Sequence, residues 1–307
     1  MTSNVKNQQQ NDSTNEKINN IVNSGEFDAR NDGAKPIENR RAIEDDVTKF
    51  SSIDYITNIA AQILREVLQS NNITYIEFIE VRIGLEGIEI LGKVLEDNKL
   101  ITAIRLCDND IDLEELSLLI KLLENNHSLI NIDIEYNNIG VQGLIILDEF
   151  LENNKTIKQI SLIGNDIGDD GADILTGLLL TNNNIIKQVD ICSNNISDKG
   201  AIILARLLKN NNTIKTICLN NNIISDVGIV QLVKALETNR TIIQIDLSYN
   251  NITDNGAITL VRLLEFNNKI TSKIVIEFTD YDNENISYQV EELLTETLES
   301  HNKKLGV

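Results

Sequence analysis

A repeat of 28 residues runs through this chain and limits what it can fold into. One copy, residues 242–267, reads IIQIDLSYNNITDNGAITLVRLLEFN. If its first residue is position 1, apolar residues at positions 1, 4, 6 and 11 follow a strand-like pattern, and the leucines after them recur at helical spacing. Neither half can bury its apolar face alone. The pattern therefore predicts a stack in which each copy packs on the next.

Seven copies fill residues 73–269. The interval between them is 28 residues, except for one interval of 29 that inserts a residue in the turn at 182–184. The copies begin at Ile73, Ile101, Leu129, Ile157, Ile186, Ile214 and Ile242.

Asparagine marks two positions of the repeat. At position 9 we expect its side chain to point inward and satisfy backbone groups of the neighbouring turn, as a ladder that keeps the coils in register. These residues are Asn109, Asn137, Asn165, Asn194, Asn222 and Asn250. At position 26, asparagine in all seven copies, we expect a left-handed turn that ends each helix. Glycine at position 15 is expected to let each helix approach its strand closely.

The pattern L-x-x-L-x-L-x-x-N-x-I, followed by a helix, resembles the leucine-rich repeat family. A 28-residue unit with a full helix is similar to the ribonuclease-inhibitor subclass of that family. The resemblance implies an α/β fold: a curved right-handed β-α solenoid, the horseshoe of this family, with a parallel sheet on its concave side and helices on its convex side.

The flanking segments lack the repeat. Residues 1–50 are polar and rich in Asn and Gln, which predicts a disordered tail. Residues 51–72 carry apolar residues at the spacing of a repeat helix and are expected to cap the first unit. Residues 270–307 are expected to form the other cap, an irregular strand followed by an amphipathic helix.

Charge and composition limit which classes of partner the chain can bind and in which cellular compartment it is expected to act. A net charge of −20 argues against nucleic acid and anionic membranes. No apolar stretch has the length of a membrane span, and the first residues lack the apolar core of a secretory signal. We therefore expect a cytoplasmic protein, acting in its own cytosol or in one into which it is delivered.

The three cysteines are expected to be free thiols. Cys107 and Cys192 share repeat position 7 but lie three units apart. Cys218 is a diagonal neighbour of Cys192, at roughly 7–8 Å, which exceeds the Cα separation that a disulfide tolerates.

Nothing in the sequence indicates catalysis. Both histidines, His127 and His301, are expected to be exposed and have no nucleophile or zinc constellation around them. The glycines recur with the repeat and form no phosphate loop. Acidic residues in 280–291 follow the spacing of a calcium loop, but Asn285 stands where that loop needs glycine. We predict no enzyme activity, cofactor or metal site.

Positions 3, 5, 7 and 8 of each unit should face the concave side, where acidic residues alternate with tyrosines. Such a surface suits a basic protein partner, because carboxylates steer and aromatics anchor. The alternative is that the acids only keep the sheet soluble. The candidate partner-binding residues are Tyr75, Glu77, Arg105, Asp108, Asp133, Glu135, Tyr136, Asp190, Asp246 and Tyr249.

The sequence thus predicts a monomeric, non-enzymatic module or scaffold for protein–protein interaction. The resemblance also leaves open a GTPase regulator of the Ran GTPase-activator type and an actin-filament end cap of the tropomodulin type. Bacterial effectors use such repeats too. The glutamate-rich segment 291–299, followed by Leu305, resembles the C-terminal signals of type IV-secreted effectors, although an ordinary acidic cap helix explains it as well.

Overall fold

The computed structural model describes residues 47–51, 73–181, 185–266, 273–275 and 286–305. Within them the strands form one parallel sheet whose order follows the chain. The strands are β1 Val47–Ser51, β2 Tyr75–Ile79, β3 Ala103–Cys107, β4 Asn131–Asp133, β5 Gln159–Ser161, β6 Gln188–Asp190, β7 Thr216–Cys218, β8 Gln244–Asp246 and β9 Lys273–Val275.

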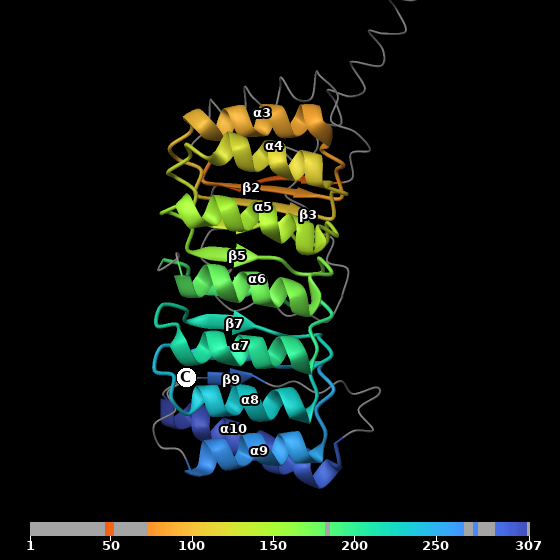
Figure 1. Cartoon of the computed structure of the whole chain (residues 1–307), viewed down its shortest axis with the longest axis vertical. Helices are drawn as coiled ribbons and strands as arrows, with labels where there is room; N and C mark the ends of the chain where they lie inside the picture. Colours follow the sequence, from red (N-terminus) through yellow and green to blue (C-terminus); the bar gives the residue numbers. More distant parts are fainter. Residues whose placement is uncertain (1–46, 52–72, 182–184, 267–272, 276–285, 306–307) are drawn as a thin grey trace, which may run out of the picture.

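A helix follows each strand from β2 onward. The helices are α3 Gly84–Asp97, α4 Leu113–Leu123, α5 Gly140–Asn153, α6 Gly168–Thr181, α7 Asp198–Asn210, α8 Asp226–Leu236, α9 Asp254–Phe266 and α10 Tyr288–Leu305. These helices stack in one column in chain order, and the column covers one face of the sheet (Figure 1). The predicted β-α solenoid is therefore confirmed. We call the surface of the sheet that faces away from the helices the concave face.

The core lies between the sheet and the helix column. In the unit that opens at Ile157, the apolar residues at positions 1, 4, 6 and 11 are buried, and so are Leu175, Leu178 and Leu179 of its helix. Strand pairing places Ile160 beside Ile132 on one side and Val189 on the other, so the apolar seam runs from coil to coil. Full burial of each such side chain contributes about 1.5–3 kcal/mol.

The position-9 asparagines lie inside the stack. Asn137 Oδ1 accepts the backbone N–H groups of Asn109 and Ile111 at 3.0 and 3.1 Å. Its Nδ2 donates to the carbonyls of Leu106 and Glu135 at 2.9 and 2.8 Å. The same pattern joins the other asparagines of the ladder. Each amide thus satisfies turn backbone that would otherwise be buried without partners.

Within the described part of the chain, the position-26 asparagines do not adopt the left-handed turn that we expected. Asn98, Asn154 and Asn211 are extended, with φ of −77°, −70° and −83°. The side chain closes the turn instead. Asn126 Oδ1 accepts the N–H groups of Ser128 and Leu129, and its Nδ2 donates to the Leu95 carbonyl in α3, the helix of the preceding unit. These bonds need no positive φ, which explains the difference.

A third ladder, of aspartates at position 13, joins the starts of successive helices. Asp198 Oδ1 accepts the N–H groups of Ser225 and Gly228 at 2.8 and 2.9 Å, and its Oδ2 accepts the Ser225 hydroxyl at 2.6 Å. Equivalent bonds link Asp169 to Ser197, Asp226 to Thr253 and Asp254 to Ser287. The recurring aspartates at position 13 are visible in the sequence, but the sequence pattern did not indicate that they bond to the next unit.

This aspartate ladder gives a further reason for glycine at position 15, which we expected only to let each helix approach its strand. A Cβ on Gly228 would lie 2.7 Å from Asp198 Oδ1 and 2.6 Å from Ile224 Cγ2. Gly200 is equally close to Asp169. The absent side chain therefore makes room for the aspartate of the preceding unit as well as for the unit's own isoleucine.

The sheet begins earlier than the predicted tail allows. Val47 lies opposite Tyr75, one repeat later, so residues 47–50 of the predicted tail belong to the sheet. Ser51, the first residue of the cap helix predicted at 51–72, ends β1 instead. The rest of the tail and residues 52–72 lie outside the described residues.

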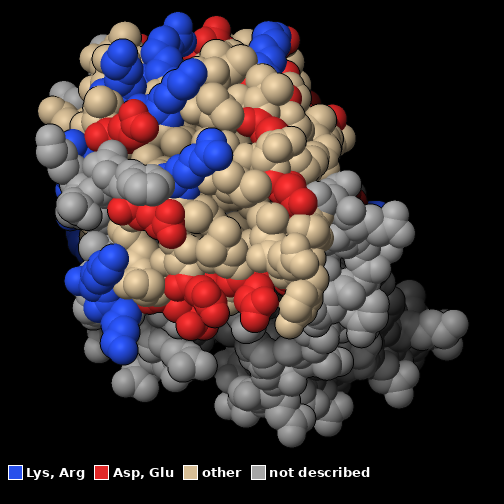
Figure 2. Space-filling model, turned by 90° about the horizontal axis from the view of Figure 1, so that it is seen from below, with Lys and Arg blue, Asp and Glu red and all other residues tan. Residues whose placement is uncertain are grey.

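At the other end, β9 pairs with β8 with Lys273 opposite Gln244, an offset of 29 instead of 28. Helix α10 packs on α9 and buries Leu294, Leu298 and His301 against the stack, so the expectation that His301 is exposed was wrong. Its outer side exposes Glu292 and Glu296. The view from below shows acidic and basic side chains with uncharged ones between them (Figure 2). Such a polar outer side suits the last unit of a solenoid.

Candidate functional site

A tight turn follows each strand from β2 to β8 and brings one residue per unit to the edge of the concave face. These position-8 residues, which we call the position-8 row, all have φ between +53° and +66°. They are Glu80, Asp108, Tyr136, Gly164, Ser193, Asn221 and Tyr249. In five of the units a second left-handed residue follows at position 10, so the two flank position 9, which is a buried asparagine in every unit except the first. The turn thus both holds the ladder and presents the row.

Tyr136 and Tyr249 are unusual residues for such a turn. Glycine, asparagine and aspartate tolerate the left-handed region, whereas a bulky side chain costs about 1 kcal/mol there. Tyr136 is 48% exposed, and its ring lies over Gly164, where a Cβ would collide with it. Tyr249 is half-buried, as is Tyr75 on β2. The turn therefore holds a partly exposed aromatic ring at a position that is Gly164 or Ser193 in the next two units.

Two of the acids that we expected to meet a partner are buried instead. Glu77 is 4% exposed and Glu135 is 1% exposed. Arg105 lies between them: its Nη1 contacts Glu77 at 2.5 Å, and its Nη2 and Nε contact Glu135 at 2.5 and 3.0 Å. The Ser161 hydroxyl donates to the second Glu135 oxygen at 2.8 Å. This network joins β2, β3 and β5 to the turn after β4.

The network holds Arg105 charged. Burial disfavours the cation, but attraction and hydrogen bonds to Glu135 outweigh that effect and raise the pKa of Arg105 above its ordinary value. Asp133 is buried too. Glu77, Asp133 and Glu135 therefore drop out of the predicted contact surface. Asp108 is exposed, and Asp190 and Asp246 are half-buried.

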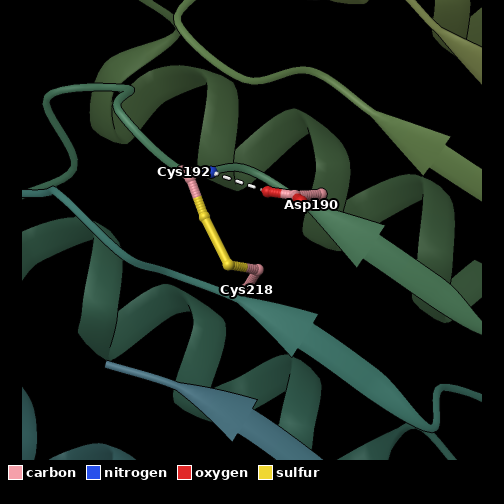
Figure 3. Close-up of side chains that lie close together, drawn as sticks. All are labelled: Asp190, Cys192 and Cys218. Atoms are coloured by element: carbon pink, nitrogen blue, oxygen red, sulfur yellow. Dashed lines mark hydrogen bonds between the residues drawn. A yellow bond between two sulfur atoms is a disulfide. The ribbon is translucent and has the colours of Figure 1, made fainter. Parts of the chain in front are cut away.

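The expectation of free thiols was wrong for two of the three cysteines. Cys192 and Cys218 form a disulfide with a Cα–Cα distance of 5.8 Å (Figure 3). Strand β6 ends at Asp190, so Cys192 lies beyond the regular pairing of β6 with β7. Cys192 therefore lies closer to Cys218 than a diagonal neighbour in a regular ladder. Cys107 is a free, buried thiol, and burial raises its pKa to about 12.

The disulfide lies among carboxylates on the concave face. The Cys192 N–H donates to Asp190 Oδ1 at 3.2 Å (Figure 3). Cys218 Sγ lies 3.8 Å from Asp246 Oδ2. The structure thus brings together Asp190 and Asp246, which we expected at the surface, with two sulfur atoms that the sequence did not indicate as a pair.

The comparisons with known proteins agree with this architecture. Residues 153–173 and 238–261 match the family model described as Leucine Rich repeat. The solved structure of the leucine-rich repeat-containing protein LegL7 from Legionella pneumophila is 15% identical, with a TM-score of 0.52, and the match covers 78% of this chain and 77% of that one. The chain is a leucine-rich repeat protein. No curated protein sequence matches it.

Two further solved structures are similar to parts of this leucine-rich repeat protein. One is the tropomodulin C-terminal domain from Caenorhabditis elegans, with 11% identity, a TM-score of 0.38, and coverage of 62% of this chain and 94% of that one. The other is the actin-binding site 2 of leiomodin-1, with 17% identity, a TM-score of 0.36, and coverage of 60% and 88%. Both TM-scores are below 0.5, so neither match is used as evidence. The support for the fold comes from the LegL7 match and the repeat model.

Leucine-rich repeat domains are generally protein-binding modules, usually without catalytic activity, and solenoids bind through their extended concave surfaces. Within the described residues of this leucine-rich repeat protein, no helix combines the length and apolarity needed to cross a bilayer.

Proposed function

We propose that this leucine-rich repeat protein is a non-enzymatic binding module whose protein partner docks on the position-8 row and the adjoining concave face. The single observation that supports this most is Tyr136, an exposed ring held in a left-handed turn. A bulky residue in a disfavoured conformation, at a position that is Gly164 or Ser193 in the next two units, points to function. Tyrosine is also among the residues that dominate interface energies.

The charge around Tyr136 favours a basic partner surface. Glu80, Asp108 and Asp166 are exposed along the same turns, and the chain as a whole has a charge of −20. Exposed carboxylates of this kind speed the encounter with a basic surface, and added salt weakens their effect. The partner surface is therefore expected to contain Lys or Arg around a pocket for the tyrosine ring.

The experiment starts from affinity purification with the wild-type chain as bait, followed by dissociation constants for the identified partner. Tyr136→Ala/Tyr249→Ala is expected to weaken binding at least about tenfold, because truncated aromatic anchors cost about 2 kcal/mol or more. The matched control is Tyr288→Ala, which removes a 77% exposed tyrosine from α10. Equal affinities for the wild type and the double variant would rule out this docking site.

A second variant tests the position of the ring without removing it. Gly164→Ala places a methyl group against the Tyr136 ring and must displace it. Its expected effect is weaker binding with circular dichroism unchanged. Raising the salt concentration is expected to slow association of the wild type.

The finer expectations stay predictions. Action in a cytosol, either the chain's own or a host's, is tested by a translocation reporter fused to the chain, with and without substitution of the exposed glutamates of α10. A GTP-hydrolysis assay with candidate GTPases and an actin-filament elongation assay test the two alternative activities. A positive result in either assay would replace the proposal of a purely binding role.

A further inference from the structure

Three potential metal ligands meet at the junction of β6 and β7. Asp190 ends β6, Cys192 follows it in the turn, and Cys218 ends β7 (Figure 3). One carboxylate oxygen and the two sulfur atoms all lie within 4.8 Å of one another. Both cysteines are buried, at 6% and 5% exposure, and Asp190 is half-buried. The cluster is thus partly shielded but open to the concave face.

The three side chains match the ligands that zinc takes in proteins. Tetrahedral zinc binds thiolates at about 2.3 Å and carboxylates at about 2.0–2.2 Å, which puts its ligand atoms roughly 3.3–3.8 Å apart. That separation fits inside the 4.8 Å spread of the cluster. A Cα–Cα distance of 5.8 Å is set by adjacent coils of the stack, so the sulfur atoms can move apart by side-chain rotation alone.

The cluster cannot bind a metal ion through its two sulfur atoms while Cys192 and Cys218 form a disulfide. Only a thiolate is a strong ligand, and neither sulfur is a thiolate while they are bonded to each other. We propose that reduction of the Cys192–Cys218 disulfide turns this cluster into a zinc site whose ligands are both thiolates and the Asp190 carboxylate. In the reduction, the disulfide takes two electrons and two protons from a dithiol, which itself becomes a disulfide. Zinc then displaces the two thiol protons into solvent.

The neighbouring groups are arranged to support such a site. Asp246 Oδ1 accepts the N–H and the hydroxyl of Ser248 at 2.9 and 2.7 Å, while its Oδ2 lies 3.8 Å from Cys218 Sγ. A water molecule can take the fourth position, and Asp246 lies beside the site. The Cys192 N–H orients Asp190 in the same way, as hydrogen bonds to metal-binding carboxylates do. The thiolates select zinc or cadmium over magnesium and calcium.

The test uses the full chain, reduced with a phosphine and desalted without oxygen, with zinc alone as the probe. Metal retained after gel filtration and the ultraviolet thiolate band of a cadmium titration are the readouts. Reduced wild type is expected to retain about one zinc per chain. The oxidised chain and Cys192→Ser are each expected to retain less than about a tenth of that, and Asp190→Asn to weaken binding at least about tenfold.

Cys107→Ser is the matched control, because it removes a buried thiol outside the cluster and is expected to leave zinc binding unchanged. Circular dichroism verifies the fold of every sample. The proposal is overturned if a reduced, folded wild type retains no zinc. It is equally overturned if Cys192→Ser/Cys218→Ser retains as much zinc as the wild type.

Discussion

Arg105 occupies the same repeat position as Asp133 and Asp190, yet it serves the fold. It lies directly opposite Glu77 in the sheet and also contacts Glu135. The sequence suggested that Glu77 and Glu135 belong to a docking surface, but both carboxylates are buried and paired with Arg105. Tyr136 differs in exposure, because its backbone is disfavoured for a tyrosine while its ring stays 48% exposed. At the scale of single residues, burial and pairing inside the fold decide whether a side chain is available to contact a partner protein.

Arg105→Met tests the buried network. The variant leaves Glu77 and Glu135 buried without their counter-charge, and breaking such a pair costs about 3 kcal/mol of unfolding free energy. Urea denaturation measures the loss. The matched control is Arg82→Met, which breaks an exposed pair with Asp110 and is expected to cost at most about 0.5 kcal/mol. Equal losses in the two variants would contradict the structural role of Arg105.

The elements of this protein are joined by ladders that run across the repeat. The position-9 and position-26 asparagines tie turns together, and the position-13 aspartates tie the start of each helix to the next. Because these bonds link residues about one repeat apart, each helix depends on its neighbour for satisfied backbone groups. The same ladder holds the final helix, through Asp254 and Ser287.

Asp198→Asn tests this ladder through its pH dependence. Burial acts in the opposite direction, but hydrogen bonds from Ser225 and Gly228 lower the pKa of Asp198 below its ordinary value. The stabilisation is therefore fully present above the ordinary pKa and is lost as the pH falls through the lowered one. The variant is expected to lose about 1 kcal/mol at pH 7, with a gap that shrinks below about pH 4. Urea denaturation at both pH values checks this, and a gap independent of pH would contradict it.

Two glycines in similar helices should respond in opposite directions to alanine. Gly228→Ala forces a methyl group against Asp198 and Ile224 and is expected to lose about 1–3 kcal/mol. Gly177 in α6 has open space around a built Cβ, so Gly177→Ala is expected to gain about 0.5–1 kcal/mol from helix propensity. Thermal and urea unfolding measure both. A loss in both variants would mean that glycine serves the helix itself, independently of the ladder.

As a whole, the molecule is a one-dimensional stack in which each unit touches only its neighbours (Figure 1). Its stability is therefore close to a sum over units and their interfaces, and removal of a whole unit should leave matching surfaces. The concave face grows with the stack. Distant residues such as Asp108 and Asp246 thus share one surface only because the units between them keep their register.

Deletion of residues 157–185 removes one complete unit and joins position 28 to position 1 of the next. The shortened chain is expected to fold with lower stability and a smaller urea m-value, because less surface is exposed on unfolding. Deletion of 157–170 removes half a unit and should prevent cooperative folding, since a helix would then face a strand position. Circular dichroism and urea denaturation distinguish the two. Similar unfolding curves would contradict the dependence on register.

The sequence by itself determined the strand, turn and helix of each unit and their stacking, because apolar periodicity acts locally and repeats every 28 residues. Only the tertiary structure decided which side chains meet across coils. It buried Glu77 and Glu135 around Arg105, joined Cys192 to Cys218 and set Asp198 against the next helix. These outcomes depend on the local distances between side chains of neighbouring coils. A linear pattern specifies which residues neighbour one another, but not how closely they approach.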